Sequence, residues 1–228
     1  MAVLAVAVAS LLILGVWVAT RSVRTALLTA LAVGAAMATQ YVIASTGILR
    51  AWHLRPPPMM LLVGVMLAAT IALARSRLGG ALAERTSFAL LVGAQAFRFP
   101  LELDMHHAAS EGVMPMQMSY SGSNFDILTG ISALALGVLL AAGKVSAAAI
   151  RVWNIAGFCL LLNIVVIAVA SLPMFHAFGE NRVNVWVTYP PFVWLPGVLV
   201  PAALLGHLLV WRKLVKAQPS STSPPPAP

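Results

Sequence analysis

The stretch FRFPLELDMHHAASEGVMPMQMSYSGSNFD, residues 97–126, decides the fold, because it interrupts a chain that is otherwise rich in Ala, Leu and Val. Only 9% of the 228 residues are charged, yet four of the six acidic side chains and two of the five histidines lie in this stretch. Such a polar segment is either a functional site or a solvated loop. Whether its first part crosses a membrane determines the number of spans.

The rest of the composition is typical of an integral membrane protein. Hydrophobic residues make up 61% of the chain and charged residues 9%, whereas soluble proteins have roughly 25% charged residues. The apolar runs are continuous instead of alternating, which favours spanning helices over a spanning β-barrel. The net charge of +8 is explained by basic loops kept in the cytoplasm, so we expect the lipid bilayer as a partner and no nucleic acid.

We predict an all-α fold, a polytopic membrane bundle of seven transmembrane helices that forms one domain over residues 1–216. Each apolar run ends at proline or at charged residues, which stop a helix. The predicted spans are residues 2–20, 26–46, 59–74, 86–107, 127–142, 149–172 and 191–211. Residues 217–228 are rich in Pro and Ser without apolar periodicity, so we expect a disordered cytoplasmic tail.

The distribution of Lys and Arg favours seven spans over six. With residues 86–107 counted as a span, ten basic residues share one side and four lie opposite, whereas without it the split is seven against seven. Cytoplasmic loops carry an excess of Lys and Arg, and only the seven-span arrangement has one. We therefore predict an N-terminus outside the membrane and a C-terminus in the cytoplasm.

A stripe of polar side chains on the fourth predicted span is the main candidate site. Arg98, Glu102 and His106 recur at four-residue spacing, so they share one helix face, and Gln95 lies one turn before Arg98. At 1.5 Å per residue from the start of the span, Arg98 is about 18 Å deep, where an ionisable side chain must face the bundle and pair. An Arg98–Glu102 ion pair that only fixes helix packing is the simpler alternative.

Other polar residues extend this candidate site. Asn163 lies in the outer half of the sixth span, from where it could hydrogen-bond Arg98 or Glu102. Asp126 immediately precedes the fifth span and joins the predicted pocket. In the last span Pro196 and Pro201 free backbone carbonyls, so we expect this helix to bend where neighbours satisfy them.

Metal binding is a second hypothesis for the outer face. Glu102 and His106 at four-residue spacing could share one ion, with His107 or His176 completing the site. Imidazole and carboxylate suit zinc or iron, and the methionines of MPMQM, residues 114–118, would suit copper. No HExxH or CxxC motif is present, and the single cysteine, Cys159, excludes a Cys-based site.

Catalysis and retinal binding are weakly indicated. No G-x-S-x-G motif is present, and the serines of SYSGSNFD, residues 119–126, are typical of a turn and a helix start. A retinal Schiff base needs a lysine deep in a helix, but Lys144, Lys213 and Lys216 all lie at predicted cytoplasmic ends, so no retinal is expected. We assign no catalytic residue, and an enzyme is the less favoured class.

The segments RFPLEL, QMSYSGSNFDILTG, LLNIVVIAVAS and FVWLPGVLVPAALLGHLL resemble a family of bacterial multi-pass membrane proteins with no established activity. The resemblance covers roughly residues 97–209. It implies a location in the bacterial cytoplasmic (inner) membrane, and it transfers no functional residue.

Three functions remain open at this point. The first is a polar pocket in the outer membrane half, built on Gln95, Arg98, Glu102, His106, Asn163 and Asp126, that binds a small ligand or ion for transport or sensing. The second is a metal-dependent membrane enzyme or metal-handling protein. The third is an accessory subunit that packs against another membrane protein or a second copy of itself and has no chemistry of its own.

Overall fold

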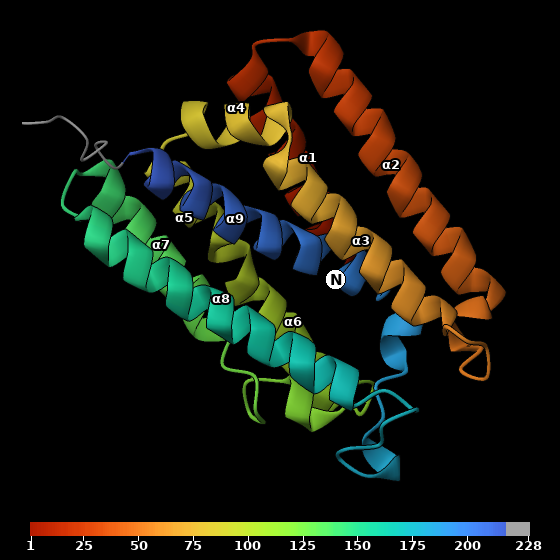
Figure 1. The fold of residues 1–228 in the computed structure, drawn as a ribbon. Coiled ribbons are helices and arrows are strands. Elements are labelled where there is room, and N and C mark those ends of the chain that lie inside the picture. Colours follow the sequence, from red (N-terminus) through yellow and green to blue (C-terminus); the bar gives the residue numbers. More distant parts are fainter. Residues whose placement is uncertain (218–228) are drawn as a thin grey trace, which may run out of the picture.

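A computed structural model describes residues 1–217, and every element assigned in them is helical (Figure 1). The expected tail lies, apart from Ala217, outside the described residues. The α-helices are α1 (Ala2–Thr20), α2 (Val23–Thr46), α3 (Pro58–Arg75), α4 (Arg77–Arg85), α5 (Phe88–Gly93), α6 (Arg98–Ser110), α7 (Ile127–Ala141), α8 (Ala147–Ala170) and α9 (Val200–Lys216). Short 3-10 helices are η1 (Ile48–Arg50), η2 (Ala94–Phe97), η3 (Met116–Met118), η4 (Glu180–Arg182) and η5 (Trp186–Thr188), and η6 (Leu195–Leu199) is a π-helix.

Five helical segments in the described part of the chain are long and apolar enough to cross a membrane. They are α1, α2, α3, α8 and the continuous segment Leu195–Lys216 formed by η6 and α9. The other two predicted spans contain shorter pieces. Residues 86–107 hold α5, η2 and most of α6, and residues 127–142 hold the 15-residue α7.

The elements α5, η2 and α6 follow one another without a break from Phe88 to Ser110. The helix tightens to 3-10 geometry over Ala94–Phe97, just before Pro100. Proline has no backbone N–H, and its ring crowds the carbonyl four residues earlier, so the regular α-helical hydrogen bonds cannot continue through this turn. The tightened turn ends at Arg98, the first residue of α6.

Two glycines of α7 allow this helix to lie directly against the segment Phe88–Ser110. A Cβ added to Gly130 would lie 2.8 Å from the Cα of Phe99, and one added to Gly137 would lie 3.0 Å from the Cα of Gly93. Small residues permit such backbone contact in lipid, where apolar burial does not drive helix association. The start of α7, with Asp126, is thereby held beside the start of α6, with Arg98.

Helix α9 packs against both α3 and α8, which lie on opposite sides of it (Figure 1). Its N-terminal extension is the π-helix that contains Pro196 and Gly197. Pro201 removes the N–H that would bond the Gly197 carbonyl, and the Nε2 of Gln40 donates to that carbonyl at 3.3 Å instead. The expected rescue of a freed carbonyl by a neighbouring helix is therefore present.

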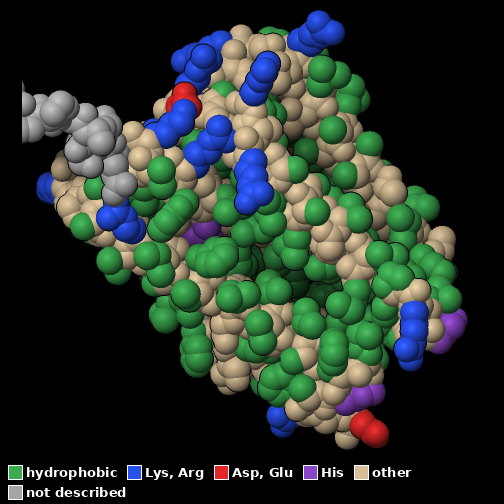
Figure 2. Space-filling view, in the orientation of Figure 1, with side chains coloured by type: hydrophobic (Ala, Val, Ile, Leu, Met, Phe, Trp, Pro, Cys, Tyr) green, Lys and Arg blue, Asp and Glu red, His purple; other side chains and the backbone are tan. Residues whose placement is uncertain are grey.

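Basic side chains of α9 donate hydrogen bonds to backbone carbonyls at the C-terminal ends of α3 and α4. Nη1 of Arg212 donates to the carbonyls of Ala74 and Ser76 at 2.6 and 2.9 Å, and Nζ of Lys213 donates to that of Ala83 at 3.0 Å. Cations at helix C-termini satisfy carbonyls that lack intrahelical partners. Most of the Lys and Arg side chains visible in Figure 2 gather at this end of the molecule.

Candidate functional site

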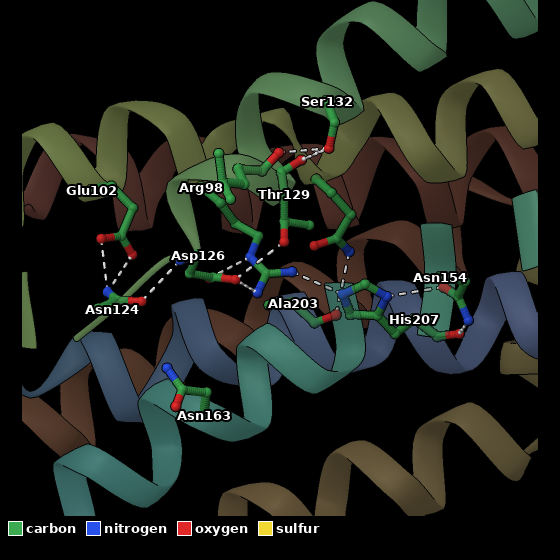
Figure 3. Close-up of polar contacts among 12 residues, drawn as sticks. Arg98, Glu102, Asn124, Asp126, Thr129, Ser132, Asn154, Asn163, Ala203 and His207 are labelled. Atoms are coloured by element: carbon green, nitrogen blue, oxygen red, sulfur yellow. Dashed lines mark hydrogen bonds and ion pairs between the residues drawn. The ribbon is translucent and has the colours of Figure 1, made fainter. Parts of the chain in front are cut away.

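Arg98 is fully buried, with 0% of its surface exposed, and it forms an ion pair with Asp126 (Figure 3). Its Nε donates to Oδ2 of Asp126 at 2.6 Å, and its Nη2 bonds Oδ1 of the same carboxylate. This bidentate geometry matches the planar guanidinium to the planar carboxylate and is the strongest form of such an ion pair. The pair is neutral overall, which is how two charges can be held among apolar helices.

Glu102 lies one turn after Arg98 and is 1% exposed, but the two do not form the ion pair that was the simpler alternative to a site. Its carboxylate accepts from Nδ2 of Asn124 at 2.9 and 2.7 Å. Asn124 also accepts from the backbone N–H of Asp126 at 3.0 Å, so the two acidic groups are held by one loop (Figure 3). The α6–α7 contact supplies Arg98 with a carboxylate on a neighbouring helix, and Glu102 is left with an amide.

His207 of α9 completes the contacts of Arg98. Its Nε2 lies 2.8 Å from Nη1 of Arg98, and its Nδ1 lies 2.9 Å from Oδ1 of Asn154 on α8. A guanidinium can only donate, so Nε2 must be the acceptor and Nδ1 carries the proton that is donated to Asn154. His207 is therefore neutral in this arrangement, and the chain Asp126, Arg98, His207, Asn154 connects α6, α7, α8 and α9.

His207 is not among the residues that the sequence predicted for the site, so this connection was missed. A signal for it was nevertheless present. Asn154 and Gly157 lie three residues apart on α8 and therefore share a face, and a Cβ added to Gly157 would lie 2.7 Å from Cε1 of His207. An amide and a glycine on one face of an otherwise apolar helix indicate a polar side chain that enters from a neighbour.

The remaining predicted site residues are distributed over a wider region. Gln95 is buried and its Nε2 donates to the Ala203 carbonyl at 3.3 Å, which strengthens the contact with α9. The ring of His106 stacks on Tyr120 with a centroid distance of 4.4 Å, away from Arg98. Asn163 donates to the backbone carbonyl of Ser123 at 2.9 Å, and not to Arg98 or Glu102 (Figure 3).

The four predicted metal ligands are not gathered. Glu102 is held by Asn124, His106 stacks on Tyr120, and the side chains of His107 and His176 are exposed. Among residues 1–217 no group of three or more His, Cys, Asp or Glu side chains could hold a metal ion. The methionines of residues 114–118 are divided as well, since Met114 and Met118 pack in the apolar core and Met116 is exposed.

A cavity of about 340 Å³ lies beside the buried polar residues. Its walls come from α3, α6, α8 and η6–α9 and are almost wholly apolar, with Gly64, Leu101 and Ile164 among them. Arg98, Glu102 and Asp126 also line it. The space-filling view is hollowed between α3 and α8, in a region surrounded by hydrophobic side chains (Figure 2). The expected polar pocket is thus an apolar cavity with charged residues along one wall.

The fold and the apolar surface place the chain among all-helical proteins with several helices able to cross a membrane. No protein-family model, curated protein or solved structure matches it.

Proposed function

We propose that the chain crosses a bacterial cytoplasmic membrane seven times, with its N-terminus outside and its C-terminus in the cytoplasm. Two observations support this topology. The segment Phe88–Ser110 lies against α7, so together they can supply the two crossings that are not single long apolar helices. The basic side chains around α4 and α9 gather at one end of the molecule, as expected for a cytoplasmic face (Figure 2).

Labelling of single cysteines in intact cells tests this topology. In a Cys159→Ser background, Arg24→Cys lies after the first crossing and Lys144→Cys after the fifth. Seven crossings put both on the cytoplasmic side, so a membrane-impermeant maleimide should label neither until the cells are permeabilised. Glu111→Cys, on the loop after α6, should be labelled without permeabilisation. If residues 86–107 do not cross, Arg24→Cys and Lys144→Cys lie on opposite sides and only one is protected.

We further propose that the cavity binds a small ligand for transport or sensing. The observation that carries this proposal is an apolar cavity of about 340 Å³ whose wall includes Arg98, Glu102 and Asp126. Ligand sites typically measure roughly 300–1,000 Å³ and combine apolar walls with a few placed polar groups. Ionisable residues within a membrane bundle are costly, which makes them functional candidates. Because the hollow lies between α3 and α8, the ligand reaches it from the lipid.

Filling the cavity tests ligand binding. A Cβ at Gly64 would meet no atom within 4 Å, so Gly64→Trp can place an indole at the cavity without a backbone clash. Native mass spectrometry of gently extracted wild-type protein should detect a bound small molecule, and Gly64→Trp should weaken its binding at least about tenfold, a change of about 1.4 kcal/mol.

Gly34→Trp is the matched control, because Gly34 of α2 also has open space at its Cβ but does not line the cavity. This variant should retain the bound molecule. Equal occupancy in Gly64→Trp and wild type, with both proteins folded, would rule the cavity out as the binding site.

A further inference from the structure

Two residues of the cavity wall, Glu102 and Asn184, have hydrogen-bond acceptors with unused capacity. The carboxylate of Glu102 receives hydrogen bonds only from the single Nδ2 of Asn124, although a carboxylate can accept about four. Asn184, which lines the same cavity, is 2% exposed, and its Oδ1 has no hydrogen-bond partner while its Nδ2 donates to the Ala168 carbonyl. A buried polar atom without a partner is costly, so a ligand that donates to it would be favoured.

One acidic residue on the wall also lacks a cationic partner. Arg98 and Asp126 neutralise each other, and His207 is neutral because it accepts from Arg98 and donates to Asn154. In the described residues no Lys, Arg or His nitrogen lies within 4.0 Å of the Glu102 carboxylate. The wall therefore carries an acidic group without a direct cationic partner, and a cation in the cavity would complement it.

The rest of the cavity wall is apolar and favours a ligand with a hydrocarbon part. Leu101, Leu161, Ile164 and Leu199 contribute hydrocarbon surface on several sides, and the hollow faces lipid between α3 and α8. A hydrophilic cation would lose its hydration there without replacement contacts. A ligand that complements both the apolar walls and the Glu102 carboxylate must combine a hydrocarbon part with a positively charged hydrogen-bond donor.

We propose that the cavity takes an amphiphilic amine, with its hydrocarbon part in the groove and its protonated nitrogen donating to Glu102. This inference rests on the ligand site proposed above and names the chemical class that the site selects. A charge-assisted hydrogen bond between ammonium and carboxylate is about twice as strong as a neutral one. Glu102 is then the residue that determines specificity, while the apolar walls determine size.

Three probes with the same chain and different head groups test the inference: dodecylamine, dodecanol and dodecanoate. Affinity is measured by native mass spectrometry of the full chain in one detergent, so that partitioning of each probe into micelles is the same for every variant. Wild type should bind dodecylamine at least about tenfold more tightly than the other two, corresponding to about 1.4 kcal/mol.

Glu102→Gln should weaken dodecylamine binding at least about tenfold and leave dodecanol binding unchanged, since Gln keeps an oxygen acceptor for Asn124 but has no charge. Glu111→Gln, at an exposed outer position, is the matched control and should behave as wild type. Thermal unfolding of both variants verifies that they are folded.

The outcomes separate the two proposals. One outcome is that all three probes bind equally, lose affinity in Gly64→Trp and keep their affinity in Glu102→Gln. The cavity is then a ligand site, and the amine inference is overturned. If dodecanoate binds best, the charge argument is overturned in the same way. If no probe binds, the amine inference fails, and if the probes bind but Gly64→Trp leaves their binding unchanged, the proposed ligand site fails with it.

Discussion

Replacing Arg98 with methionine should lower the free energy of unfolding by about 3–5 kcal/mol, the usual cost of removing one member of a buried ion pair. Methionine fills a similar volume but leaves the Asp126 carboxylate buried with the Thr129 hydroxyl, 3.3 Å away, as its remaining side-chain donor. His207 also loses the donor at its Nε2. Among single substitutions we expect this one to have the largest effect, because the chain of hydrogen bonds that passes through Arg98 connects four helices. Tryptophan fluorescence during detergent-induced unfolding measures it.

Two controls show whether the loss comes from the ion pair. Arg55→Met changes an exposed arginine on the loop before α3 and should be near neutral. Arg98→Met combined with Asp126→Leu removes both charges and should regain much of the lost stability, since an apolar pair of similar volume often replaces a buried ion pair without loss. If Arg98→Met proves as stable as Arg55→Met, the proposed central role of the pair is wrong.

Gly130→Ala should lower the free energy of unfolding by about 1–3 kcal/mol, the usual cost of overpacking. The added methyl group would lie 2.8 Å from the Cα of Phe99 and 2.9 Å from the carbonyl carbon of Arg98, and backbone atoms cannot rotate away as a side chain can. Helix α7 must therefore move from α6, and Asp126 moves with it away from Arg98. The same unfolding measurement in detergent gives the size of the effect.

Gly34→Ala is the matched control, because its Cβ would meet nothing within 4 Å. This substitution should cost nothing and can gain up to about 1 kcal/mol in helix propensity. Gly130→Ala should also cost less when Arg98→Met and Asp126→Leu are already present, because part of its effect passes through the ion pair. Additive losses would instead mean that the α6–α7 contact and the ion pair are independent.

The all-helical class and five long apolar helices could be derived from the sequence because they depend on local properties. A long apolar run such as residues 2–20 has to satisfy its own backbone hydrogen bonds in lipid, and only a helix does so within one segment. The helix α1, Ala2–Thr20, occupies that run. Proline positions were equally informative, since the loss of the Pro201 N–H predicted a freed carbonyl, which Gln40 satisfies.

The candidate site was only partly accessible in this way. Four-residue spacing places Arg98 and Glu102 on one buried face of α6, and the cost of burying a charge requires that Arg98 be paired. Both conclusions need only one helix. The choice of partner needs two, because the close approach at Gly130 brings Asp126, and not Glu102, to the guanidinium.

The sequence by itself therefore determined which segments are apolar helices and that Arg98 must be buried with a partner. Tertiary structure alone decided that the partner is Asp126, that His207 and Asn154 extend the contacts, and that His106, His107 and His176 do not meet. The physical reason is distance. Hydrophobicity and helical spacing act within one segment, whereas a hydrogen bond between helices requires side chains from separate segments to lie within about 3 Å of each other, and this depends on how all the helices pack.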